Sequence, residues 1–156
     1  MNPRRSRRRC KGDDGQFAGI EVLPFSLLIF VVGSLVVANA WAVIDAKLMV
    51  TTAAREAARA YVESPDRATA LAASRERADE VARGHGRRTD RLDLTWKPSS
   101  PPFARCARVT AVATYRVPAL TLPFVGSLGQ GFHVVSQHSE SVDPFRSGLE
   151  GVADCA

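Results

Sequence analysis

Residues 20–44 read IEVLPFSLLIFVVGSLVVANAWAVI, and this stretch decides the fold. It is too long and too apolar for the core of a small soluble domain. About 20 apolar residues are enough to cross the roughly 30 Å hydrocarbon core of a bilayer, so the stretch predicts a transmembrane helix. An ionisable group inside a span is costly unless it is paired or lies at the interface. Glu21 is therefore a candidate functional residue, and an interfacial carboxylate that reaches water is the alternative.

The residues before this stretch are strongly basic. Six cations precede the span, namely Arg4, Arg5, Arg7, Arg8, Arg9 and Lys11, whereas both signs of charge are mixed after it. By the positive-inside rule, a leader over residues 1–19 stays in the cytoplasm and residues 45–156 are exported. A nucleic-acid-binding tail is the alternative. A topology signal explains the cluster without a partner, so we expect no nucleic acid.

The N-terminal region also carries a candidate cleavage site. Ala38-Asn39-Ala40 has the small-x-small form that signal peptidase accepts, so cleavage after Ala40 would release a secreted domain. The apolar run is longer than a usual signal peptide core, and it continues past Ala40 without a helix breaker. These features favour a retained span, which leaves open a cut on its cytoplasmic side.

The helical pattern continues beyond the span. Residues 45–62 contain no Gly or Pro, which predicts a helical rod over residues 45–63 that continues the membrane helix. One apolar stripe follows its three- and four-residue steps: Ala46, Met49, Val50, Ala53, Ala57, Ala60 and Tyr61. Such a stripe either covers the core of its own domain or forms a subunit interface, and both interpretations are kept.

A second helix is predicted over residues 65–83. Ser64-Pro65-Asp66 provides a capping serine, a proline suited to the first helical position and an acidic group for the helix dipole. Gly84 and Gly86 are expected to end this helix. Its thin apolar face would contain Leu71, Ala72, Ala78, Val81 and Ala82.

Strand patterns fill residues 91–142. Apolar and polar residues alternate over residues 92–96 and 107–117, and a third strand is expected over 132–142. An apolar loop over residues 119–128 is either folded under the sheet or exposed as a contact patch. The fold class is α+β, with a long membrane-spanning helix, a second helix and a roughly three-stranded antiparallel sheet.

The chemistry of the chain does not suggest an enzyme. His85, His133 and His138 are too scattered for a metal site, and no phosphate loop or Cys-x-x-Cys motif occurs. We expect no catalytic residue, metal or cofactor. Cys106 and Cys155 fall on the exported side, where oxidation is permitted, and are predicted to form a disulfide.

Several of these features occur in one order along the chain. A basic leader, Gly15, Glu21 and Pro24 at the start of an apolar helix, and the alanine-arginine run 53–59 together resemble TadE-like pilus assembly proteins of the type IV pilin-like, tight-adherence class. The resemblance covers mainly residues 15–62. It implies cleavage after Gly15 by a prepilin peptidase, assembly with other pilin-like subunits and a platform protein, and a role for Glu21 in helix packing.

Other functional interpretations stay open. Glu21 would follow a cut after Gly15 one residue later than is usual in the family, so an uncleaved protein is an alternative. A signal-anchored extracytoplasmic binding or sensing module, with the loop over residues 119–128 as its contact, is the main rival function. A secreted domain cleaved after Ala40 is the third.

Overall fold

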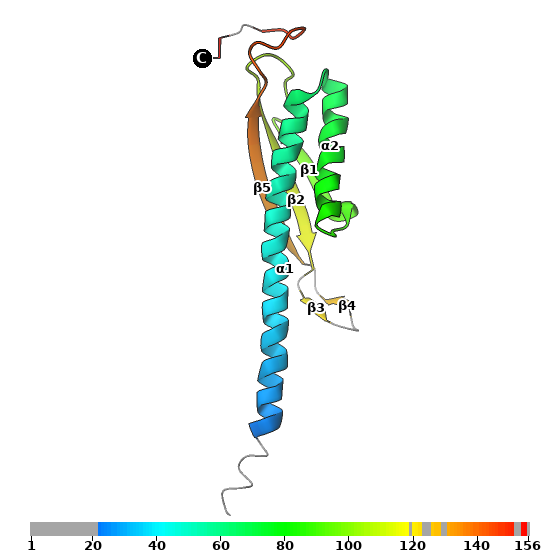
Figure 1. The fold of residues 1–156 in the computed structure, drawn as a ribbon, viewed down its shortest axis with the longest axis vertical. Coiled ribbons are helices and arrows are strands. Elements are labelled where there is room, and N and C mark those ends of the chain that lie inside the picture. The colour runs from blue at the N-terminus through cyan, green and yellow to red at the C-terminus, as the bar shows by residue number, and fades with distance from the viewer. Residues whose placement is uncertain (1–21, 119, 123–125, 129–130, 152–153, 156) are drawn as a thin grey trace, which may run out of the picture. The chain divides into compact units, whose positions relative to one another are not determined.

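The structure is a computed structural model that describes residues 22–118, 120–122, 126–128, 131–151 and 154–155. The chain divides into two compact units, Met1–Val37 and Ala38–Ala156, which are described separately below. The described part of the first unit is the apolar beginning of one helix. The second unit contains the rest of that helix and all the other elements (Figure 1).

Helix α1 runs without interruption from Val22 to Glu63. This confirms the prediction that the apolar stretch and the following rod form one helix. Among the described residues, α1 is the one helix long and apolar enough to cross a membrane, and none of its most apolar window is buried within the chain.

Helix α2 spans Arg67–Gly84, so it begins two residues later than predicted. Asp66, not Ser64, is the N-cap, and its carboxylate accepts a hydrogen bond from the backbone N–H of Thr69 at 2.9 Å. The Ser64 hydroxyl instead donates to the carbonyl of Ala60 in the last turn of α1. Gly86, with φ +65°, lies just beyond the end of α2, where a left-handed backbone is favourable for glycine.

A three-stranded antiparallel sheet follows the short 3-10 helix η1 (Thr89–Arg91). Its strands are β1 (Leu92–Lys97), β2 (Arg108–Val117) and β5 (Phe132–Ser141), in the order β1-β2-β5. All three lie close to their predicted ranges, the first two of which come from the alternating pattern. The segment expected as an apolar loop is different, because its described residues form a second sheet of two strands, β3 (Leu120–Leu122) and β4 (Gly126–Leu128).

Both helices cover one face of the three-stranded sheet (Figure 1). The register places Leu92 opposite Tyr115 and Leu94 opposite Ala113, so these residues share the helix-facing side. Alanines of α1 and α2 pack on this face. At one end of the core the Tyr61 ring lies 4.7 Å from Trp96 and 5.5 Å from Phe103, measured between ring centroids.

The buried face of α2 agrees with the predicted one at Ala78 and Ala82, and Val81 is partly buried against the core, but the other predicted residues are exposed. Its fully buried residues are Ala70, Ser74, Ala78 and Ala82. Leu71 is 38% exposed and Ala72 is also exposed, because the buried stripe recurs every four residues from Ala70 and leaves both of them off it. Ser74 can be buried there because its hydroxyl donates to the carbonyl of Ala70 at 2.6 Å.

Candidate functional site

The residues predicted to take part in processing and assembly precede Val22 in the sequence or belong to α1. Gly15 and Glu21 fall outside the described residues. Pro24 lies in the first described turn of α1. Ala40 is exposed and lies within unbroken helix, so no turn or loop marks it as a cleavage point.

The first half of α1 is an exposed apolar surface. Its large side chains are between about half and three-quarters exposed: Val22, Leu23, Phe25, Leu27, Leu28, Ile29, Phe30, Val31, Val32, Val36, Val37, Trp41 and Ile44. No charged residue interrupts this surface between Val22 and Ile44. Exposed apolar surface of this extent marks a site of interaction with lipid or with another apolar surface.

The second half of α1 buries its stripe inside its own domain. Eight residues of this helix are fully buried: Ala46, Met49, Val50, Ala53, Ala54, Ala57, Ala58 and Tyr61. Of the predicted stripe only Ala60 is partly exposed, and Ala54 and Ala58 were missed. The structure therefore shows that the stripe covers the core of its own domain, which is the first of the two interpretations.

The C-terminal segment is fastened to the loop before β2. Cys106 and Cys155 form a disulfide with their Cα atoms 5.2 Å apart, which agrees with the predicted pair. The N–H of Arg105 donates to the carbonyl of Glu150, and the N–H of Cys106 donates to the carbonyl of Val142. Two backbone hydrogen bonds therefore reinforce the covalent link.

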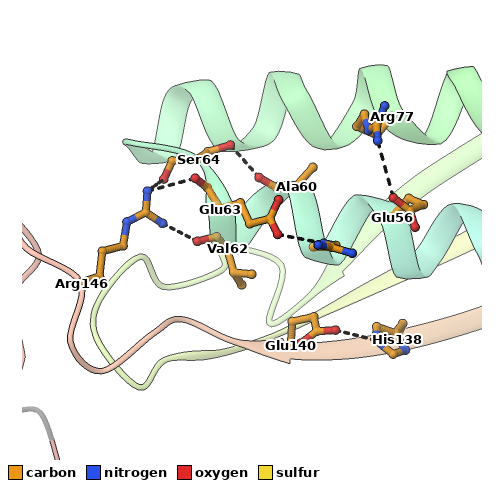
Figure 2. Close-up of polar contacts among 10 residues, drawn as sticks. Glu56, Ala60, Val62, Glu63, Ser64, Arg77, His138, Glu140 and Arg146 are labelled. Atoms are coloured by element: carbon orange, nitrogen blue, oxygen red, sulfur yellow. Dashed lines mark hydrogen bonds and ion pairs between the residues drawn. The ribbon is translucent and has the colours of Figure 1, made fainter.

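Arg146 connects this C-terminal segment to the end of α1 (Figure 2). Its guanidinium donates to the backbone carbonyls of Val62, Glu63 and Ser64, the bond to Glu63 being 3.1 Å long. The last carbonyls of a helix have no partner within the helix and carry its negative dipole end. The guanidinium also lies 5.7 Å from the centroid of the Phe103 ring. Arg146 is therefore a cap supplied from 82 to 84 residues away in the sequence.

A second arginine joins the other end of the domain to α1. Arg87, just after α2, donates to the Asp45 carboxylate at 2.6 Å and to the carbonyl of Ala42 at 3.1 Å. Its guanidinium lies 6.0 Å from the centroid of the Tyr115 ring. Hydrogen bonds from Arg87, and a weaker one from His85, hold the pKa of Asp45 below its usual value despite partial desolvation.

Further charged side chains form ion pairs along the helices (Figure 2). Glu56, Arg59, Glu63 and Arg77 line a shallow hollow of about 270 Å³ between α1 and α2. Arg59 pairs with Glu63 at 2.8 Å, and Arg77 pairs with Glu56 at 3.8 Å. Because opposite charges balance within the hollow, it offers no excess charge to a ligand. Within the described part of the chain, no group of three or more His, Cys, Asp or Glu residues could hold a metal ion.

Sequence reasoning did not find the two arginine contacts. Arg87 and Arg146 lie among many exposed arginines, and no periodicity distinguishes them. The one available signal was the position of Asp45 as the first charge after the apolar stretch, which calls for a neutralising partner.

Comparisons of this chain with protein-family models, with curated proteins and with solved structures give no match.

Proposed function

We propose that this chain is a membrane-anchored, minor pilin-like (TadE-like) structural subunit of a tight-adherence or type IV pilus assembly or secretion system. One observation carries the proposal: α1 is a single helix whose first half exposes apolar side chains and whose second half forms the core of a small α+β domain. A subunit of this kind needs a helix that serves both as a membrane anchor and as the spine of its exported domain.

The membrane topology follows from charge and from the disulfide. The basic leader stays in the cytoplasm, α1 crosses the bilayer and the domain after Asp45 is extracytoplasmic. The disulfide between Cys106 and Cys155 supports this orientation, because such bonds persist in oxidising compartments.

Glu21 guides assembly in this proposal. In the sequence it immediately precedes Val22, the first described residue of α1. Packed between the helices of neighbouring subunits, it would be neutralised by the amino terminus of another subunit, and this pairing would set the axial register. A buried ion pair of this type contributes specificity more than stability.

The test of processing is the intact mass of the full chain, expressed in a membrane with and without the prepilin peptidase of a tight-adherence system. Cleavage after Gly15 only when the peptidase is present is the expected result. Cleavage after Ala40 by signal peptidase would identify a secreted domain and overturn the proposal.

The test of assembly compares Glu21→Gln with Glu76→Gln, which changes an exposed glutamate of α2 in the same chemical way. We expect Glu21→Gln to abolish co-purification with other pilin-like subunits and the platform protein while export continues, and Glu76→Gln to have no effect. Normal assembly of Glu21→Gln would refute the assigned role. It would instead favour a signal-anchored binding module, for which Glu21 is dispensable.

A further inference from the structure

We propose that a groove at one end of the three-stranded sheet binds a phosphate ester of a hydroxyl-bearing compound, such as glycerol phosphate or a sugar phosphate. The groove lies within the second unit, on the face of the sheet that points away from α1 and α2. The inference goes beyond the proposed function, because it requires neither a membrane span nor a neighbouring subunit.

Three basic side chains lie side by side across the strands at this end of the sheet. Arg116 of β2 pairs with His133 of β5 in the strand register. On the other side of β2, Leu92 pairs with Tyr115, so Arg91, which precedes Leu92, lies next to Arg116. Arg91, Arg116 and His133 all line an open groove of about 380 Å³. A groove of this volume is large enough for a small organic ligand.

The chain itself leaves this row of basic groups without a counterion. Within the part of the chain that the structure describes, the side chains of Arg116 and His133 form no hydrogen bond or ion pair. The carboxylate of Asp90 is held by Arg88, which donates to its two oxygens at 3.0 and 2.8 Å, and Arg91 adds only a longer-range attraction. Like charges placed directly opposite one another destabilise a sheet. An anion bound in the groove would remove this repulsion.

The number of donors favours a phosphate group over a carboxylate. A carboxylate has two oxygens, and a single guanidinium can bind both of them. A phosphate monoester has three terminal oxygens, which accept hydrogen bonds from several directions. The guanidinium groups of Arg91 and Arg116 and the imidazole of His133 supply donors from three neighbouring segments of the chain.

The neighbouring pair of residues favours a ligand that also carries hydroxyl groups. Asp93 and Thr114 pair in the strand register and line the same groove. The Asp93 carboxylate would repel a bare phosphate ion, whereas it can accept a hydrogen bond from a hydroxyl group. The Thr114 hydroxyl can donate or accept. The combination of basic groups and an adjacent carboxylate therefore suits a phosphate carried on a polyol or a sugar.

The experiment is isothermal titration calorimetry of the oxidised full chain in a nonionic detergent, which contains no phosphate. Low ionic strength is used because salt screens exposed charges. The probes are glycerol phosphate, inorganic phosphate and glycerol. A further titration uses micelles that contain phosphatidylglycerol, in which a phosphate ester of glycerol is part of a lipid headgroup.

Arg116→Gln is the main test, and Arg108→Gln is its matched control. Both arginines are exposed on β2 and point to the same face of the sheet, but Arg108 lies at the other end of the strand, outside the groove. Arg91→Gln repeats the test from the segment before β1. Asp93→Ala tests the contact with the hydroxyl groups. The thermal midpoint of each variant shows whether it keeps its fold.

We expect the chain to bind glycerol phosphate more tightly than inorganic phosphate, and glycerol not at all. Arg116→Gln should weaken binding about tenfold, as expected for the loss of one hydrogen bond from a charged group. Arg108→Gln should change it less than about twofold, because a charge so far from the groove is screened. Asp93→Ala should tighten the binding of inorganic phosphate and reduce the preference for the ester.

The other outcomes also decide the question. Binding of the phosphatidylglycerol micelles alone, lost in Arg116→Gln and not in Arg108→Gln, would support the phosphate site and identify a lipid headgroup as its source. No binding of any phosphate-bearing probe, or an equal loss in both arginine variants, would overturn the proposal. An unchanged preference in Asp93→Ala would overturn the hydroxyl contact.

Discussion

Replacement of Arg146 by methionine tests whether a distant guanidinium holds the end of α1 in place. Methionine retains much of the length and the apolar stem of arginine and removes the charged head. The backbone carbonyl of Arg146, which accepts a hydrogen bond from Arg105, remains. The substitution therefore isolates the contacts of the guanidinium with Val62, Glu63 and Ser64 and with the Phe103 ring.

The expected cost follows from these contacts. A hydrogen bond to a charged group contributes about 1.5–3 kcal/mol when its loss leaves a buried partner unsatisfied. A cation at a helix C-terminus contributes about 0.3–1 kcal/mol, and a cation–π contact about 0.5–1 kcal/mol. Because Arg146 is only half-buried, water can replace part of its bonding. We expect a loss of about 2 kcal/mol in the free energy of unfolding, or about 8 °C in Tm for a domain of this size.

The assay is thermal and urea unfolding of the oxidised full chain in detergent, followed by the fluorescence of Trp96 in a Trp41→Phe background. Arg88→Met is the matched control, since the ion pair of Arg88 with Asp90 is 71% and 58% exposed. This control should leave the unfolding midpoint almost unchanged, because water and salt screen an exposed ion pair. Arg146→Lys should lie between the two, because lysine retains the charge without the planar fork. An effect of Arg146→Met no larger than that of the control would refute the reasoning.

Three further predictions concern the domain. Replacing Cys106 and Cys155 by serine should lower the free energy of unfolding by about 4 kcal/mol, because the bridge closes a loop between residues 49 apart. Reduction of the unsubstituted chain should have the same effect, and a urea midpoint that reduction leaves unchanged would contradict this. The pKa of Asp45 is lowered in the folded chain, so its contribution is present above the ordinary value of 3.8 and is lost as the pH falls through the folded value. Asp45→Asn should flatten the acid limb of a stability-against-pH curve. Asp66→Ala should lower the unfolding midpoint through loss of the N-cap of α2, whereas Asp66→Asn should lower it clearly less in the same unfolding assay.

Local patterns in the sequence were enough for the main elements. The apolar stretch over residues 20–44 and the absence of Gly and Pro over 45–62 predict the long helix, and the period-two alternation around Ala111 and Ala113 predicts the central strand. If residues 45–156 are exported, Cys106 and Cys155 are the two cysteines in an oxidising compartment, which predicts that they pair. Each of these signals lies within one segment or depends on chemistry with few alternatives.

The errors arise where tertiary contacts override a local preference. The hydrophobicity of Leu71 predicts it on the buried face of α2, yet the residues of this helix that face the core are Ala70, Ser74, Ala78 and Ala82. Asp66 caps α2 in place of the predicted Ser64, because the Ser64 hydroxyl donates its hydrogen bond to a carbonyl of α1. The β3 and β4 pairing was missed because glycines and prolines in that segment favour a loop at least as strongly as a hairpin.

The candidate site was predictable only in part. Glu21 and Pro24 follow from the sequence, as does the apolar surface of α1. The contacts of Arg87 and Arg146 with α1 could not be read from it, because they join residues more than 40 positions apart and their partners are mostly backbone carbonyls. Every residue has a backbone carbonyl, so the amino-acid sequence does not show which carbonyl accepts a hydrogen bond.

The alanine-lined packing of α1 also has a mechanical consequence. From Ala46 to Ala58 the helix lies against the sheet through many small contacts spaced along its length. A pull along the helix axis would load these contacts together, in shear, instead of opening them one at a time. The disulfide and the hydrogen bond of Arg146 to Glu63 then hold the C-terminal end of this contact between helix and sheet. Because these contacts would share the load, more force would be needed to separate α1 from the sheet along its axis than across it.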